Sequence, residues 1–189
     1  MHLGDYVKIV DGFFEEKNIN LFLKVCETFT YKSSGIVTPV SDNTIDKNVR
    51  NVEECQMSKV HKSPTNITWN NYFRYKITKA VHTVYSQGLK HFPLQEIISL
   101  AVLKYKEGGF YNTHTDHVAT HPRNLSVIIF LNDDYEGGEV EIFSPDEENS
   151  KIIEPKKGRM IIWPSNFLYP HKAHVVEKGV RYALVSWLL

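Results

Sequence analysis

The chain has 189 residues, 42% of them hydrophobic, and its 22 basic and 22 acidic side chains balance. A chain of this length can bury about 70% of its unfolded surface, so it can fold without disulfides or structural zinc. Balanced charge argues against binding to nucleic acid or to membrane surfaces, because both rely on an excess of Lys and Arg. We therefore expect a globular protein with no nucleic-acid partner.

The cysteines and the hydropathy pattern bear on the compartment. Cys26 and Cys55 have neither metal-ligand nor redox spacing, which indicates a reducing environment. Residues 1–11 carry scattered charges and lack the apolar run of a signal peptide. No stretch reaches the roughly 18 to 20 apolar residues that span a bilayer. The sequence thus predicts a cytoplasmic protein with no membrane partner.

The first half of the chain mixes strand and helix patterns. Val7, Ile9 and the Phe13–Phe14 pair indicate an opening strand. Residues 15–29 follow with apolar side chains three and four positions apart, the period of an amphipathic helix. Cys26 falls on the apolar face of this helix, so we expect it in the core.

A polar segment separates this helix from a second one. Residues 32–50 hold too few apolar side chains for a core, and we expect them to form a mobile loop. Apolar residues from Trp69 to Val84 then predict a second helix, with Gly88 as its C-terminal cap.

From residue 97 onward the chain consists of short apolar runs rich in Val, Ile, Tyr and Phe, separated by turn residues. These runs predict strands at 97–105, 110–118, 125–131, 139–143, 151–153, 159–163 and 180–188. So many closely spaced strands indicate an α+β, mainly β, sandwich or jelly roll, with N-terminal helices packed on one sheet. We expect one domain over 1–189, with helical support over about 1–94 and a jelly-roll core over about 95–189.

Five of the nine histidines fall between residues 114 and 174. His114 and Asp116 are two positions apart, and a strand turns such positions to one face, so an imidazole and a carboxylate converge. His171 is the candidate third ligand. Two histidines and one carboxylate are the ligand set of non-haem Fe(II) oxygenases, which keep coordination positions open. Chance spacing and surface histidines are the alternative explanation.

The residues around these candidates extend the pattern. Tyr105, Gly108, Tyr111, His114 and Asp116 follow the spacing Tyr-x-x-Gly-x-x-Tyr-x-x-His-x-Asp. Further matches are His171, Val175–Val176, Gly179, Arg181 and Trp187, with Leu131–Asn132, 135–139 and 158–165 between the two groups. This pattern resembles the prolyl 4-hydroxylase-like branch of the 2-oxoglutarate- and Fe(II)-dependent dioxygenases, strongly over residues 95–189.

The resemblance implies a double-stranded β-helix, a jelly roll, whose catalytic metal ligands are His114, Asp116 and His171. His171 is preferred over His174 because Arg181 lies ten residues beyond it, and the family places its anion-binding residue nine to ten residues after the ligand. His117 and His174 then fall outside the ligand set. The implied cofactors are Fe(II), 2-oxoglutarate as cosubstrate and O2, with ascorbate as a further reductant.

The resemblance also implies cosubstrate-binding residues. Arg181 would pair with the outer carboxylate of 2-oxoglutarate, because a guanidinium offers that group two parallel donors. Tyr105, with Tyr111 as the alternative, would donate a hydrogen bond to the cosubstrate. Some relatives add a tyrosine from the central strand, but residues 127–131 here contain no phenol, and Ser126 is the substitute that this part of the sequence offers.

The implied function is hydroxylation coupled to decarboxylation of 2-oxoglutarate to succinate. Prolyl residues of a protein or peptide are the expected substrate, and residues 33–50 would suit a lid over such an extended chain. Two alternatives remain open at this point. One is hydroxylation of a small molecule or a free amino acid, and the other is a non-catalytic jelly-roll domain that binds metal or ligand.

Overall fold

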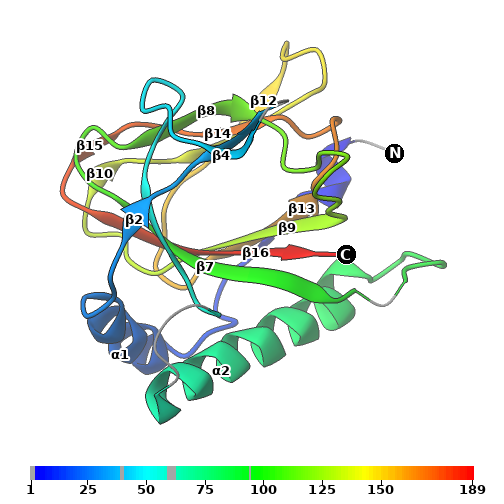
Figure 1. Cartoon of the computed structure of the whole chain (residues 1–189). Coiled ribbons are helices and arrows are strands. Elements are labelled where there is room, and N and C mark those ends of the chain that lie inside the picture. The colour runs from blue at the N-terminus through cyan, green and yellow to red at the C-terminus, as the bar shows by residue number, and fades with distance from the viewer. Residues whose placement is uncertain (1–2, 39–40, 59–62, 94) are drawn as a thin grey trace.

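The computed structural model describes residues 3–38, 41–58, 63–93 and 95–189. Two antiparallel sheets face each other, and two helices pack on the outer face of the larger one (Figure 1). The helical segments are η1 (Leu3–Tyr6), α1 (Glu16–Cys26), α2 (Pro64–Ala80) and the π-helical turn η2 (Val81–Tyr85). No helix in these residues is long and apolar enough to span a membrane.

The described strands form two large sheets and two short pairs. The larger sheet has the order β1 (Lys8–Val10), β13 (Met160–Pro164), β9 (Leu125–Phe130), β16 (Arg181–Leu188), β7 (Ile97–Tyr105), β6 (Glu53–Gln56), β2 (Lys32–Ser33). The smaller sheet has the order β12 (Ser150–Ile153), β11 (Val140–Phe143), β14 (His171–Ala173), β8 (Phe110–His114), β5 (Arg50–Asn51). The short pairs are β3 (Ile36–Thr38) with β4 (Ser41–Thr44) and β10 (Glu136–Gly137) with β15 (Val176–Lys178).

The order of strands confirms the predicted mainly-β jelly roll with helices on one sheet. From β7 to β16, the chain passes back and forth between the two large sheets, apart from the β11–β12 hairpin and the short β10 and β15. The two sheets therefore present inward faces that are built from alternating parts of the same segment. Side chains distant in sequence meet between them.

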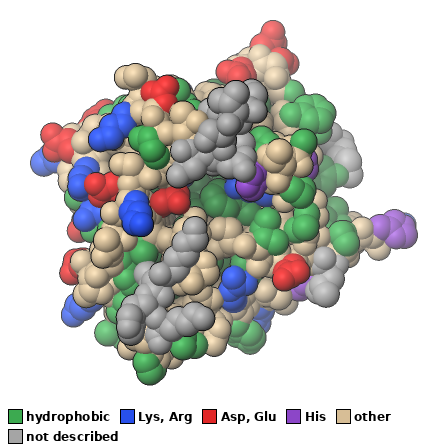
Figure 2. All heavy atoms as spheres, in the orientation of Figure 1, with side chains coloured by type: hydrophobic (Ala, Val, Ile, Leu, Met, Phe, Trp, Pro, Cys, Tyr) green, Lys and Arg blue, Asp and Glu red, His purple; other side chains and the backbone are tan. Residues whose placement is uncertain are grey.

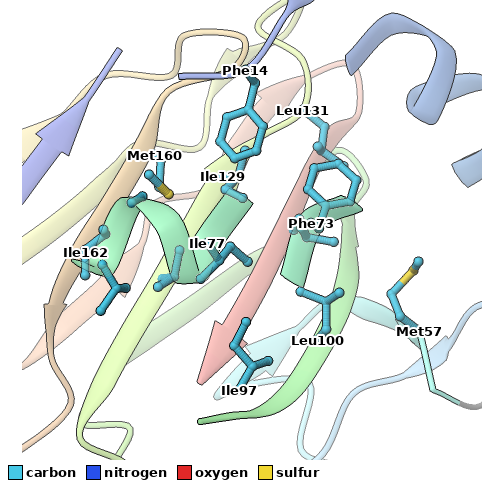
Figure 3. Close-up of a cluster of buried hydrophobic side chains, with 14 of the residues drawn as sticks. Phe14, Met57, Phe73, Ile77, Ile97, Leu100, Ile129, Leu131, Met160 and Ile162 are labelled. Carbon is cyan, nitrogen blue, oxygen red and sulfur yellow. The ribbon is translucent and has the colours of Figure 1, made fainter. Parts of the chain in front are cut away.

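The core between the helices and the larger sheet is aromatic and aliphatic. Phe22 of α1 and Phe73 of α2 are fully buried, with ring centroids 4.6 Å apart. Figure 3 shows Phe73 and Ile77 facing Leu100 and Ile129 of the sheet. These contacts fix α1 and α2 on the outer face, so the inner face of the same sheet is free to line a cavity.

The predicted helices are present with shifted ends. The first runs over Glu16–Cys26 instead of 15–29. The second begins at Pro64, five residues before the predicted start, because Ser63 accepts a hydrogen bond from the Asn66 backbone and Pro64 suits a first helical position. Gly88 has a positive φ of 82°, but it is not the cap: the helical segment ends at Tyr85 and Ser86 is its C-terminal cap.

The prediction of a loop over residues 32–50 is wrong, because short strands occupy much of this range. β2, β3, β4 and the start of β5 lie in this range, and β6 follows; residues 39–40 lie outside the described residues. Polar sequence is compatible with these strands because β2 and β5 are sheet edges and β3 pairs with β4. The function of this segment as a lid stays a prediction.

The strands of the second half largely match the prediction. β7 covers 97–105 as expected, whereas β8 ends at His114 instead of 118. The short strands β10, β14 and β15 were not predicted, because two or three residues with charged or ring side chains give no apolar run.

A charge cluster fastens the edge strand β1 to the sheet. Arg159 donates from Nε and Nη2 to the two carboxylate oxygens of Asp11, at 2.8 and 2.9 Å, and Lys156 Nζ is 3.0 Å from Oδ2. The hydrogen bond from Arg159, more than any other contact, holds the pKa of Asp11 well below its usual value.

Replacing Asp11 by Asn should therefore destabilise the fold in a pH-dependent way. The pKa is lower in the folded than in the unfolded state, so the pair stabilises above about pH 4 and its contribution is lost as pH falls further. The Asp11 side chain is 38% exposed, and we expect a loss of only about 1 kcal/mol at pH 7. Urea unfolding at pH 7 and pH 3 measures this. An equal difference at both values would contradict it.

Candidate metal centre and cavity

Three candidate ligands meet between the sheets. His114 ends β8 and His171 begins β14, and the two residues are direct partners in the antiparallel register. Nε2 of His114 lies 3.7 Å from Oδ1 of Asp116, and Nε2 of His171 lies 3.5 Å from Oδ2. Ligand atoms of all three residues lie within 4.8 Å of one another.

The backbone feature that brings Asp116 to the two histidines differs from the predicted one. It lies in a bend two residues after β8, not on the strand with His114. The chain turns inward after His114, and Asp116 is 8% exposed. The convergence that the motif predicts is present, but the turn produces it instead of strand alternation.

The hydrogen bonds of the two imidazoles orient their second nitrogens. Nδ1 of His114 lies 2.8 Å from the Asn112 carbonyl, and Nδ1 of His171 lies 3.1 Å from the Tyr169 carbonyl. A carbonyl only accepts, so each Nδ1 carries the hydrogen and each Nε2 presents a lone pair to the centre. Burial, followed by the nearby His171, lowers the pKa of His114, which is therefore neutral at pH 7.

Asp116 is held ionised by its neighbours. Burial raises its pKa, but the imidazoles of His171 and His114, the Ser126 hydrogen bond and the Arg123 charge together lower the pKa below its usual value. Ser126 Oγ donates to Oδ2 at 2.6 Å and lies 2.8 Å from Ser165 Oγ. The suggested use of Ser126 as a cosubstrate donor is therefore wrong, because its hydroxyl serves the Asp116 carboxylate.

Aromatic rings pack around the two imidazoles. Tyr111 stacks on His114 with centroids 3.5 Å apart, and the guanidinium carbon of Arg50 lies 4.6 Å from the Tyr111 centroid. Trp163 meets His171 edge-on at 4.9 Å. These contacts restrict the rotation of both imidazoles, and they place Tyr111 against a candidate ligand.

Arg181 begins β16 and lies opposite Tyr105 in the β16–β7 register. It is 1% exposed, and its guanidinium carbon lies 4.6 Å from the Tyr105 centroid and 5.2 Å from the Phe130 centroid. Its Nε and Nη1 are buried with no hydrogen-bond partner in the described part of the chain. A buried guanidinium without an acceptor is costly, so this position suits an anion.

A cavity of about 900 Å³ lies between the sheets and includes the candidate metal centre. The surface in Figure 2 is hollowed between the sheets, with apolar side chains in the recess. Its walls combine rings, cations and polar groups, notably Arg50, Glu54, Gln56, Tyr105, Tyr111, Arg123, Trp163 and Trp187. The exposed Ile98 and Leu189 lie at its border.

The two other nearby histidines lie outside the cluster. Nε2 of His174 is 2.8 Å from the Glu141 carboxylate, and Nδ1 of His117 is 2.9 Å from the Arg123 carbonyl. Sequence reasoning missed Arg123, whose Nη1 donates to the Asp116 carbonyl at 3.0 Å and whose guanidinium carbon lies 3.9 Å from the Trp187 ring centroid. Trp163 falls in the matched segment 158–165, but the sequence assigned it no function. No spacing rule links Arg123 to the motif.

Comparison with known families supports the same conclusion. Residues 100–189 match the family model of the 2OG-Fe(II) oxygenase superfamily. The matched segment contains all three candidate ligands and Arg181. A PKHD-type hydroxylase of Synechococcus sp. (strain JA-2-3B'a(2-13)) is 34% identical over 100 residues, which are 49% of this chain and 43% of that protein. One from Psychrobacter sp. (strain PRwf-1) is 36% identical over 94 residues, 44% and 35% of the two chains. The matches thus cover less than half of these relatives.

Solved structures show the same fold. A prolyl-4-hydroxylase of Pseudomonas putida has a TM-score of 0.71 and 16% identity, covering 96% of this chain and 91% of that one. A prolyl hydroxylase from Trichoplax adhaerens, in complex with a hypoxia inducible factor peptide fragment, has a TM-score of 0.72 and 17% identity, covering 97% and 83%. At this identity the likeness concerns the fold.

The residues present fit the cofactors that the superfamily implies, Fe(II), 2-oxoglutarate and O2. Two imidazoles and one carboxylate supply a donor set that this metal accepts. Nε and Nη1 of Arg181, unpaired among the described residues, supply donors for a carboxylate, and its guanidinium carbon lies 4.6 Å from the ring centroid of Tyr105, which lines the cavity.

Proposed function

We propose that this chain is a 2-oxoglutarate-dependent hydroxylase that acts on prolyl residues of a protein or peptide. The observation that carries the proposal is a candidate three-ligand centre in a cavity that Tyr105 also lines, with the buried guanidinium of Arg181 against the Tyr105 ring and two of its nitrogens unpaired among the described residues. Bound iron and 2-oxoglutarate would supply the chemistry in which O2 converts 2-oxoglutarate to succinate and CO2 while one oxygen atom enters a substrate C–H bond.

The residues of the chain have distinct functions in this proposal. Nε2 of His114, Nε2 of His171 and the Asp116 carboxylate would hold the metal, with tautomers fixed by the Asn112 and Tyr169 carbonyls. Arg181 would bind the outer carboxylate of 2-oxoglutarate, with Tyr105 beside it. The apolar and aromatic walls would exclude water from the reacting groups. No general acid or base is required.

Arg123 and Trp187 support a peptide substrate. The Arg123 guanidinium lies over the indole face of Trp187, and both line the cavity beside Asp116. The Arg123 guanidinium can donate to a carbonyl of a peptide in the cavity, and the Trp187 indole beneath it holds that guanidinium in place through a cation–π contact. The exposed Ile98 and Leu189 at the border offer apolar surface to flanking residues of an extended chain.

Hydroxylation of a free amino acid is the second candidate, and one observation favours it. Arg50 and Glu54 both line the cavity, with Arg50 Nη2 3.8 Å from the Glu54 carboxylate. A guanidinium and a carboxylate side by side present both charges that a zwitterion needs. A peptide would use the same pair for main-chain hydrogen bonds, so product analysis has to separate the two substrates.

The test is a mass-spectrometric screen of proline-containing peptides and of amino acids for the gain of one oxygen, with 2-oxoglutarate omitted as control. We expect gain on a peptide. The Arg123→Gln variant should raise the KM for that peptide by about tenfold, because it removes a charge-assisted hydrogen bond. The matched control is Arg74→Gln, which alters an α2 arginine bonded to Asn70 and to the Ile97 carbonyl.

Each result of this screen has a defined meaning. Oxygen gain on amino acids alone would replace the peptide proposal with the second candidate. Absence of succinate with every substrate, from protein that binds Fe(II), would favour a non-catalytic binding domain. An equal KM change in the Arg123→Gln and Arg74→Gln variants would remove Arg123 from the substrate site.

A further inference from the structure

We propose that the hydroxyl group of Tyr135 is the second donor, beside Arg181, to the outer carboxylate of 2-oxoglutarate. This inference rests on the proposed function and names a further binding residue for it. Tyr135 lies immediately before β10, outside the central strand β9, whose residues 125–130 include no phenol. The hydroxyl would thus come from a different segment of the chain.

The first observation is an accumulation of unpaired donors. Seven buried side-chain polar atoms have no hydrogen-bond partner among the described residues, and three of them are Tyr135 Oη, Arg181 Nε and Arg181 Nη1. Native proteins rarely leave such atoms unpaired, because each one costs free energy. A guanidinium carries donors and no acceptor, so these groups call for an acceptor from outside the chain.

The second observation is that glycines bring Tyr135 and Arg181 together. A Cβ atom at Gly138 would lie 3.1 Å from Cε2 of Tyr135 and 3.2 Å from Cδ of Arg181, so both side chains pack against that glycine. At Gly179, two residues before Arg181, a Cβ atom would lie 3.2 Å from Cβ of Tyr135. Both glycines have a positive φ, which other residues rarely adopt.

The surroundings of Tyr135 keep its phenol protonated, so that its hydroxyl can donate a hydrogen bond. Burial raises the pKa of Tyr135, and the positive charge of Arg181 offsets this only in part, so the pKa stays above its usual value. Tyr135 is therefore a neutral O–H donor at pH 7, next to a permanent cation. A carboxylate is the acceptor that satisfies both groups together.

The other rings near Arg181 are placed for a different use. The ring centroids of Tyr105 and Phe130 lie 4.6 and 5.2 Å from the guanidinium carbon of Arg181. Such contacts stabilise the cation through the ring faces and hold it in place. The Tyr105 hydroxyl is not among the buried unpaired atoms, whereas that of Tyr135 is.

The test compares Tyr135→Phe with wild type in the binding of 2-oxoglutarate, using Mn(II) in place of Fe(II) under anaerobic conditions and titration calorimetry. We expect affinity to fall by about 10- to 100-fold, the range for a hydrogen bond to a charged group. Binding of 2-oxopentanoate, which lacks the outer carboxylate, should be unchanged. The matched control is Tyr75→Phe, on an α2 side chain that is 63% exposed.

A double variant checks that Tyr135 and Arg181 act on one group. The losses of Tyr135→Phe and Arg181→Lys should fall short of additivity when combined, because both act on one carboxylate. Gly179→Ala, which pushes on Tyr135, should also weaken 2-oxoglutarate binding.

The outcomes separate this inference from the proposed function. Unchanged 2-oxoglutarate affinity in Tyr135→Phe, or an equal loss for 2-oxopentanoate, would overturn the assignment of Tyr135 alone. Failure of wild-type protein with Mn(II) to bind 2-oxoglutarate would overturn both. A circular dichroism melt of each variant shows whether a loss reflects unfolding.

Discussion

The Asp116→Ala variant is expected to produce no succinate above background from 2-oxoglutarate and Fe(II). Asp116 is the one carboxylate of the candidate triad, and its loss leaves only the two imidazoles as ligands. Loss of even an outer-shell partner costs about 10- to 100-fold in metal affinity, and a direct ligand should cost at least as much. Metal titration and quantification of succinate by mass spectrometry measure the two effects.

The matched control for this variant is Asp146→Ala. Asp146 is an exposed turn residue whose carboxylate accepts a hydrogen bond from the Glu148 backbone at 3.1 Å. It should keep both metal affinity and turnover. Succinate formation by Asp116→Ala at the wild-type rate would show that the three residues do not hold a catalytic metal.

The Arg181→Met variant is expected to bind 2-oxoglutarate more weakly by about 2 to 5 kcal/mol, the cost of removing one partner of a buried charged pair. The same change should leave the unfolding free energy of the ligand-free protein equal or higher. The reason is that Arg181 is 1% exposed with two unpaired nitrogens, and Met retains much of its apolar volume. Function and stability should therefore change in opposite directions.

Chemical unfolding with and without 2-oxoglutarate and Mn(II) measures both effects. At a concentration of 100 times Kd, the ligand should stabilise wild type by about 2.7 kcal/mol, and Arg181→Met should lose nearly all of that. The Arg74→Met control should show the reverse pattern. Its unfolding free energy should fall because two hydrogen bonds are lost, whereas stabilisation by the ligand should be unchanged. A large loss of stability in ligand-free Arg181→Met would indicate that Arg181 has a structural partner.

Local patterns in the sequence were sufficient for much of the fold. β7 was predicted at its observed ends, and the apolar face of α1 with Ile19, Phe22 and Cys26 is buried as its period indicates. These elements depend on the alternation of apolar and polar residues within one segment. The polar strands β2 to β5 escaped prediction because edge strands and short paired strands need no apolar face.

The sequence by itself determined which side chains belong to the candidate centre, because His114, Asp116 and His171 follow a motif of fixed spacing. Only the tertiary structure decided how they meet. The register of β14 on β8 sets His171 opposite His114, and the bend after β8 turns Asp116 inward. The positions of Ser126, Arg123 and Tyr135 were also decided there. Their contacts join segments from different strands and loops, and such long-range pairings leave no period in the chain that brings them together.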